Sequence, residues 1–221
     1  AFMELHDFTA INVTVPYKKA VIPYLDQLDP LAERIGAVNT IVNRSGRLTG
    51  YNTDYFGFLY LLDRSGIHVS GKKVLVLGNG GAAQPVFAAL SERGAEETIV
   101  VKYREEPGTV TYETAASLHA DTEIIINTSP VGMFPNTDAT PIDLTPYRGL
   151  QAAVDIIANP LETRFLREAR ERGARTAGGL DMLVAQAKYA VEFFLDIKIP
   201  DEKIAPIRDE IAALMQQKEN R

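Results

Sequence analysis

The chain has 221 residues, of which 46% are hydrophobic, and a formal net charge of −6. This length allows one large core or two smaller ones, and the negative charge argues against binding to nucleic acid or to an anionic membrane. The absence of cysteine excludes disulfides, thiolate nucleophiles and cysteine-ligated metals. The three histidines are far apart, so we expect no metal site. No apolar run could span a bilayer, so we expect a cytoplasmic protein, and its partner is expected to be a small molecule.

The first part of the chain predicts a strand, a helix, a hairpin and a second helix. Residues 10–15 alternate apolar and polar side chains and stop at a proline, as a strand entering a turn does. A helix is expected over 17–28. Residues 37–43 and 47–50 predict a hairpin around a Ser-Gly turn, and 54–65 carries apolar residues at helical spacing.

The middle of the chain predicts a strand–helix–strand unit. Residues 73–77 form a short, almost continuously apolar stretch, which is typical of a buried parallel strand. A glycine-rich turn follows, then a helix over 84–94 and a strand over 97–101. A unit of about 30 residues with this order is a βαβ motif.

Strands and helices continue to alternate toward the C-terminus. Further strands are predicted at 124–126 and 153–157, and further helices at 163–172, 181–195 and 201–217. Such alternation indicates an α/β fold with a doubly wound parallel sheet and helices on both of its faces.

The glycine-rich turn between strand and helix suggests a dinucleotide site. Its residues are Gly78, Asn79, Gly80, Gly81 and Ala82. In this context backbone N–H groups can approach a pyrophosphate, and the helix N-terminus favours an anion. The glycines could instead serve only a tight turn, but the strand and helix on either side favour nucleotide binding.

Two cationic residues follow the second strand of this unit. Lys102 and Arg104 stand where NADP-binding proteins place cations for the 2′-phosphate, which favours NADP over NAD. They could also be solvated surface charges, and Glu105 and Glu106 weaken the local positive field.

Polar side chains gather in the N-terminal quarter. Asn12 and Thr14 lie on one face of the predicted strand, and Lys18 follows the turn at its end. Asn39 and Asp54 add an amide and a carboxylate, and such groups suit a polyhydroxylated ligand. Each of them also has a purely structural interpretation, for example Asp54 as a helix N-cap.

Six stretches, in order, resemble the shikimate dehydrogenase family. They are Asn-Val-Thr-Val-Pro-Tyr-Lys (12–18), Gly-Ala-Val-Asn-Thr (36–40), Gly-Tyr-Asn-Thr-Asp (50–54), Gly-Asn-Gly-Gly-Ala-Ala (78–83), Asn-Thr-Ser-Pro-Val-Gly-Met (127–133) and Gly-Gly-Leu-Asp-Met-Leu-Val-Ala-Gln (178–186). An ordered set that spans nearly the whole chain is more specific than any one motif. The resemblance implies an NADP-dependent oxidoreductase that reduces 3-dehydroshikimate to shikimate in aromatic amino-acid (chorismate) biosynthesis.

The resemblance also implies roles for individual residues. Lys18 and Asp54 would be the catalytic pair. The implied substrate contacts are Asn12, Thr14, Asn39 and Gln186, and the implied cofactor contacts beyond the glycine-rich turn, Lys102 and Arg104 are Asn127, Thr128, Met133, Gly179 and Met182. The chemistry is consistent, because hydride reduction of a ketone leaves an alkoxide that an adjacent ammonium can stabilise and protonate.

A two-domain organisation is expected. Residues 1–53 would form part of a substrate-binding domain, 54–178 a Rossmann-like dinucleotide domain, and 179–221 helices that return to the substrate domain. The active site would lie between the domains, where ligand sites are common. We expect a monomer or a homodimer.

The sequence departs from the family pattern in three places. Family members begin with further residues that hold a Ser-x-Ser pair, so we expect this chain to lack the family's N-terminal beginning. Ala158 stands where the family's Asp-x-x-Tyr-x-Pro motif has tyrosine, and the residues after Val101 lack the usual Asn-Arg-Thr. Two alternatives therefore stay open: a quinate/shikimate dehydrogenase using NAD or NADP, and a non-catalytic module that binds metabolites or dinucleotide.

Overall fold

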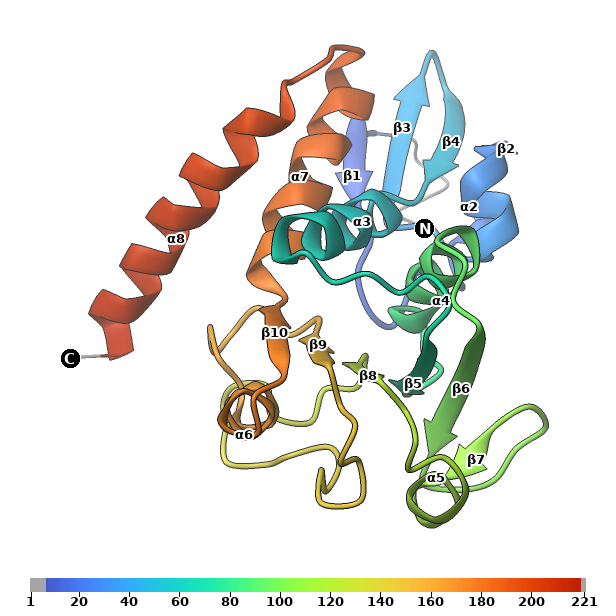
Figure 1. Ribbon diagram of the computed structural model, residues 1–221. Coiled ribbons are helices and arrows are strands. Elements are labelled where there is room, and N and C mark those ends of the chain that lie inside the picture. The colour runs from blue at the N-terminus through green and yellow to red at the C-terminus, as the bar shows by residue number, and fades with distance from the viewer. Residues whose placement is uncertain (1–6, 220–221) are drawn as a thin grey trace.

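The computed structural model describes residues 7–219, which form two sheets joined by long helices. The smaller sheet has the strand order β1-β3-β4-β2 and lies beside the upper end of α7 in Figure 1. Its strands are β1 (Ala10–Asn12), β2 (Gln27–Leu28), β3 (Thr40–Arg44) and β4 (Arg47–Tyr51). The predicted hairpin is confirmed as β3 and β4, which pair antiparallel.

The helix predicted over 17–28 is wrong. Turns occupy this segment, together with the short 3-10 helix η1 (Ile22–Tyr24) and strand β2. Pro23 offers no N–H to an α-helix and disfavours the helical conformation of the residue before it. The apolar residues of the segment instead pack on the small sheet, where Val21 contacts the core around Ile41 and Leu48.

A short helix that was not predicted follows this segment. It is α2 (Pro30–Ile35), and its N-cap is Asp29, whose Oδ1 accepts a hydrogen bond of 2.9 Å from the Leu31 N–H. It ends at Gly36, which has a φ of 69°. An acidic N-cap, proline at the first helical position and a left-handed glycine at the end are strong local signals, so this helix could have been found from sequence.

The larger sheet is parallel throughout and has the strand order β10-β9-β8-β5-β6-β7. The strands are β5 (Lys73–Leu77), β6 (Glu97–Lys102), β7 (Val110–Thr111), β8 (Ile124–Asn127), β9 (Ala152–Asp155) and β10 (Arg175–Gly178). The strand order reverses between β5 and β8, and ligands of doubly wound sheets bind at the carboxyl ends of the strands at such a point. The predicted α/β fold with a doubly wound parallel sheet is confirmed.

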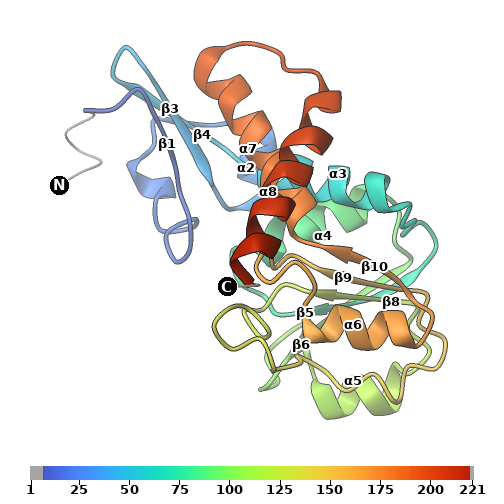
Figure 2. The ribbon, with the colours of Figure 1, turned by 90° about the vertical axis from the view of Figure 1, so that its left-hand side faces the viewer.

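Helices cover both faces of this sheet, as Figure 2 shows. Successive residues of each strand point to opposite faces, so Val74 and Val76 pack with α3 (Asp54–Ser65) and α4 (Ala83–Glu92). Leu75 and Leu77 pack on the other face with α5 (Tyr112–Leu118) and α6 (Arg164–Glu171). Burial on both faces therefore explains why residues 74–77 of β5 are continuously apolar.

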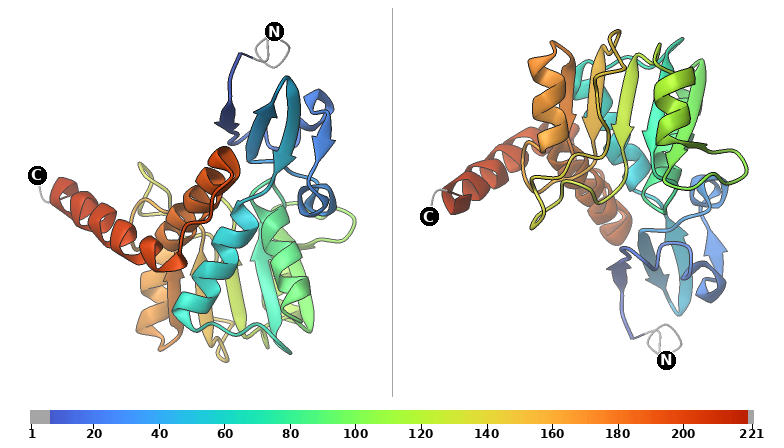
Figure 3. Two further views of the ribbon diagram at one scale, coloured as in Figure 1. Left: turned by 90° about the horizontal axis from the view of Figure 1, so that it is seen from above. Right: turned by 90° about the horizontal axis from the view of Figure 1, so that it is seen from below.

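Helix α7 (Leu180–Leu195) connects the two sheets. It follows β10, runs along α3 and reaches β3 of the small sheet. After η2 (Asp201–Lys203), α8 (Ile204–Glu219) folds back on α7 and extends from the body, as the left view of Figure 3 shows. No helix among residues 7–219 combines the length and the apolar character that crossing a membrane requires.

Candidate active site

Lys18 and Asp54 meet between the two sheets. Lys18 lies in the turns that follow β1, and Asp54 is the first residue of α3, which Asn52 and Thr53 separate from the end of β4. The Lys18 Nζ donates a hydrogen bond of 2.6 Å to Asp54 Oδ2, and the two side chains are only 12% and 10% exposed. The positive N-terminus of α3 favours the carboxylate. The ion pair fixes the ammonium in place at the edge of a cavity.

Asn39 lies at the centre of a buried hydrogen-bond network beside this pair. Its Oδ1 accepts from the Thr53 N–H at 2.7 Å and from Thr40 Oγ1 at 2.9 Å. Its Nδ2 donates to Thr53 Oγ1 at 3.0 Å and to Gln186 Oε1 at 3.4 Å. Asn12 donates to the Asn39 carbonyl at 3.3 Å. The network therefore fixes the amides of Asn12, Asn39 and Gln186, which come from β1, from the residue before β3 and from α7.

These side chains line a cavity of about 300 Å³. Six of its residues are those predicted for catalysis and substrate binding, and three are predicted cofactor residues. The first set is Asn12, Thr14, Lys18, Asn39, Asp54 and Gln186, and the second is Ala82, Gly179 and Met182. Ile156 and Ala158 add an apolar wall. A cavity with a polar and an apolar side suits a small hydroxylated ring placed against a flat cofactor ring.

The glycine-rich turn borders the same cavity and fits a pyrophosphate. Gly78 has a φ of 106°, which only glycine adopts readily. The N-cap of α4, Ala82, makes no side-chain cap hydrogen bond, which leaves N–H groups at this helix start for an anion. A Cβ on Gly81 would lie 3.5 Å from Lys18 Cβ, so the turn passes directly beside the lysine.

Asn127 and Thr128 are held by internal hydrogen bonds after β8. The Asn127 Nδ2 donates to Asp155 Oδ1 at 3.1 Å and to the Val131 carbonyl at 3.2 Å, and Thr128 Oγ1 donates to the Leu77 carbonyl at 2.8 Å. Neither side chain lines the cavity of about 300 Å³, and neither does the exposed Met133. Their observed contacts shape the loop itself.

Asp155 was not predicted as a site residue. It is fully buried at the end of β9, where its carboxylate accepts from Thr163 Oγ1 at 2.7 Å and from the Ile157 N–H at 3.1 Å, besides Asn127. Burial raises the pKa of Asp155 to about 6, although these hydrogen bonds act to lower it. A lone acidic residue at the end of an apolar strand is the sequence signal that could have indicated it.

The two cations predicted for the 2′-phosphate differ in their surroundings. Lys102 at the end of β6 forms an ion pair with Glu106 at 2.5 Å. Arg104 is exposed and forms no ion pair within residues 7–219. Both lie at the carboxyl end of the strand next to the glycine-rich turn, as the dinucleotide arrangement requires.

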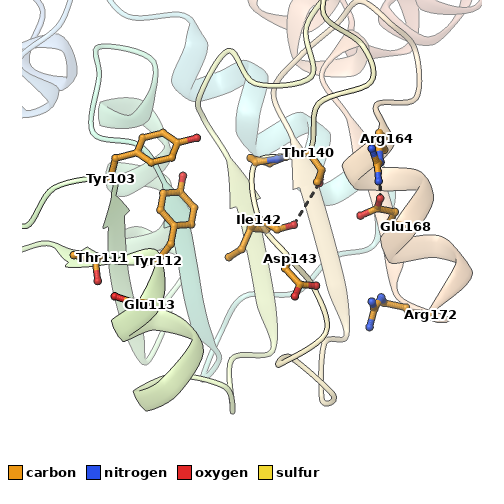
Figure 4. A pocket seen from close by; sticks show the side chains of 11 residues that line it. Tyr103, Thr111, Tyr112, Glu113, Thr140, Ile142, Asp143, Arg164, Glu168 and Arg172 are labelled. Carbon is orange, nitrogen blue, oxygen red and sulfur yellow. Dashed lines mark hydrogen bonds and ion pairs between the residues drawn. The ribbon is translucent and has the colours of Figure 1, made fainter.

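A second cavity, of about 760 Å³, lies on the α5 and α6 face of the large sheet. Figure 4 shows Tyr103 and Tyr112 on one side of it and Arg164 paired with Glu168 on the other. It contains none of the residues of the Lys18 cavity. Its larger size does not identify it as the active site, because the convergent polar groups lie in the other cavity.

A glycine-rich turn that suits a dinucleotide, beside a buried lysine that can transfer a proton, fits the class of NAD(P)-dependent oxidoreductases. Comparisons with known proteins identify the family within this class. The family model "Shikimate dehydrogenase substrate binding domain" matches residues 1–41. The NADP(+) shikimate dehydrogenase of Moorella thermoacetica is 40% identical over 211 residues, covering 87% of this chain and 72% of the relative. That of Geobacillus kaustophilus is 42% identical over 196 residues, covering 82% and 71%.

Solved structures agree with these relatives. A chorismate mutase/shikimate 5-dehydrogenase fusion protein from Clostridium acetobutylicum superposes with a TM-score of 0.91 at 33% identity, covering 98% of this chain and 81% of that one. The Thermus thermophilus shikimate 5-dehydrogenase in complex with NADP(H) and shikimate has a TM-score of 0.82 at 34% identity, covering 96% and 82%. The chain belongs to the shikimate dehydrogenase family, which confirms the resemblance carried by the six sequence motifs.

Proposed function

We propose that this protein catalyses the NADP-dependent, reversible reduction of 3-dehydroshikimate to shikimate. The observation that carries the proposal is the Lys18–Asp54 pair, which lies in a cavity that the glycine-rich turn also borders. NADPH, when bound, supplies the hydride, and the protein orients the reacting groups. The relatives' names and the complex of the Thermus thermophilus enzyme with NADP(H) and shikimate support the same reaction.

In this proposal Lys18 handles the proton. Its Nζ hydrogen-bonds the ketone oxygen, stabilises the alkoxide that forms and donates a proton to it, and in the reverse direction Nζ accepts that proton. Asp54 holds the ammonium within 2.6 Å of its own carboxylate and thereby fixes its position. Binding of the substrate in a cavity of about 300 Å³ excludes most water from the pair.

The remaining cavity residues bind and orient the substrate ring. Asn39 and Gln186 present amides whose orientation is set by their mutual hydrogen bond and by Thr53. Asn12 and Thr14 face the same space from the end of β1 and the turn after it. Such side chains donate to and accept from hydroxyl groups, so they suit a ring with several hydroxyls.

We also propose the domain division at residues 53 and 178. The strands within residues 10–51 form the small sheet with its own apolar core, and those within 73–178 form the large sheet. Helix α7 then returns to β3. Because one chain supplies every residue of the cavity, a monomer would be complete, and a homodimer would carry two independent sites; light scattering during size-exclusion chromatography distinguishes the two states.

The experiment that tests the function follows reduction of NADP⁺ by its absorbance with shikimate as substrate. Quinate and NAD⁺ are run in parallel, since the family resemblance leaves these alternatives. Turnover with shikimate and NADP⁺ supports the proposal. Binding of shikimate or NADP⁺ without any turnover would favour the non-catalytic module, although a pure binding protein has less need of the Lys18–Asp54 pair.

A further inference from the structure

An acidic side chain occupies the place where a dinucleotide 2′-phosphate would need cations. Lys102 is the last residue of β6, and its Nζ lies 2.5 Å from Glu106 Oε1. The two side chains are 30% and 51% exposed. The cation that ends the strand is therefore already neutralised by a residue four positions further along the chain.

The structure holds Glu106 in this position through its backbone. Its N–H donates to Thr109 Oγ1 at 3.0 Å, and its carbonyl accepts from the Thr109 N–H at 2.9 Å. Thr109 is buried, and the chain then returns as β7, in which Thr111 pairs with Lys102. The loop thus leaves Lys102 and comes back beside it, which keeps the Glu106 carboxylate close to the ammonium.

This ion pair lies next to the glycine-rich turn. The Gly78 N–H donates to the Val101 carbonyl at 3.0 Å, and Leu77 pairs with Val101 in the sheet. Lys102 is the next residue. A dinucleotide whose pyrophosphate sits on the turn places its adenosine ribose at the end of the second strand, so the 2′ position of that ribose falls beside Lys102 and Glu106.

We propose that Glu106 is a cofactor-specificity residue that weakens the preference of this protein for NADP over NAD. A 2′-phosphate carries a charge of about −1.5 to −2. To bind, this phosphate must displace Glu106 from Lys102 and must lie near the Glu106 carboxylate, which repels it. The 2′-hydroxyl of NAD is uncharged and has neither cost. The inference rests on the proposed use of a nicotinamide dinucleotide.

The test measures equilibrium binding by calorimetry, without turnover, for NADP⁺, NAD⁺ and 2′,5′-ADP. We expect E106Q to bind NADP⁺ and 2′,5′-ADP roughly three- to tenfold more tightly, as fits the free energy of an ion pair near the surface, with little change for NAD⁺. The gain should shrink at high salt, because salt screens exposed charges. E105Q is the matched control, since Glu105 is exposed and forms no ion pair within residues 7–219.

A double variant separates the ion pair from general electrostatics. In a K102Q background, E106Q should increase the affinity for NADP⁺ by a smaller factor, because the ammonium that pairs with Glu106 has been removed. Equal gains from E105Q and E106Q, or equal gains for NADP⁺ and NAD⁺ in E106Q, would overturn the role of Glu106. If the unaltered protein bound none of the three ligands, the proposed dinucleotide function itself would fail, which is a different outcome.

Discussion

At the scale of single residues, Lys18 is the side chain on which the proposed chemistry depends most. Replacing it in K18M keeps much of the apolar stem but removes the ammonium that protonates the alkoxide. We expect turnover to fall by about 10²- to 10⁴-fold, the usual contribution of a general acid, while the dissociation constant for NADP⁺ changes little. Steady-state kinetics and calorimetry measure the two quantities separately.

The adjacent lysine provides the control for this variant. Lys19 is exposed and forms no ion pair within residues 7–219, so K19M should retain normal turnover. A K18M protein that lost turnover and NADP⁺ binding to the same degree would contradict the assigned role, because the loss would then reflect a damaged fold and not a missing proton donor.

The raised pKa of a second residue, Asp155, predicts how the stability of the protein depends on pH. Its pKa in the folded state is raised from 3.8 to about 6 by burial. Folding therefore favours the protonated carboxyl group of Asp155. The stability that this group contributes is fully present below pH 3.8 and is lost as the pH rises through about 6. The shift corresponds to roughly 3 kcal/mol.

The variant D155N isolates this contribution. Asparagine is neutral throughout and can still hydrogen-bond to Thr163 and Asn127. Urea unfolding of both proteins across this pH range should show the variant gaining stability relative to the unaltered protein as the pH rises. Two curves that stayed parallel would mean that Asp155 has no raised pKa in the folded protein.

The sequence motifs identified the catalytic and substrate side chains, but not the contacts of two acidic residues. Lys18, Asn39 and Asp54 stand in recognisable motifs, and the structure brings them into one cavity. Asp155 and Glu106 gain their surroundings from burial on β9 and from the return of a loop. The sequence shows only that each is an acidic residue at or after the end of a strand. Their contacts depend on which strands become neighbours, and no local pattern reports that.

At the scale of helices and strands, the close packing of α3 against α7 sets the position of Gln186. A Cβ on Gly57 would lie 2.6 Å from the Met182 carbonyl oxygen and 3.0 Å from Gln186 Cβ. We expect G57A to lower the free energy of unfolding by about 1–3 kcal/mol through overpacking, despite the better helix propensity of alanine. The KM for shikimate should rise, because α7 must move away from α3.

Another glycine gives the matched substitution. A Cβ on Gly149 meets nothing within 4 Å, so G149A should leave both stability and KM close to normal. Chemical denaturation and steady-state kinetics on the two variants supply the comparison. If G57A were as stable as G149A, the two helices would not be in the tight contact described.

The sequence predicted helices and strands correctly where the hydrophobic pattern was long or was bounded by turn-forming residues. The helix over 54–65, the strand over 73–77 and the hairpin have these signals, and the structure confirms them. Strands β2 and β7 contain two residues each, which is too short for any period to be visible. They exist because a neighbouring strand offers hydrogen-bonding partners, and that is a property of the assembled sheet.

At the scale of the whole molecule, the proposed active site depends on how the small sheet is held to α7. Tyr51 of β4 stacks on Phe193 with ring centroids 4.1 Å apart, and Arg44 donates to the Phe193 carbonyl at 3.1 Å. The same helix carries Gln186 and Met182 into the cavity, while the small-sheet side supplies Lys18 and Asn39. The far end of α7 therefore fixes the distance between the two halves of the site.

This arrangement predicts that F193A separates substrate binding from cofactor binding. The stacked pair contributes about 0.5–1.5 kcal/mol beyond its buried area, and without it the small sheet can shift relative to α7. The KM for shikimate should rise, whereas NADP⁺ affinity should stay close to normal, because the glycine-rich turn and Lys102 belong to the large sheet. L195A on the same helix end is the control, since Leu195 is 63% exposed. Equal losses of shikimate and NADP⁺ affinity in F193A would show instead that the two sheets act as one rigid unit.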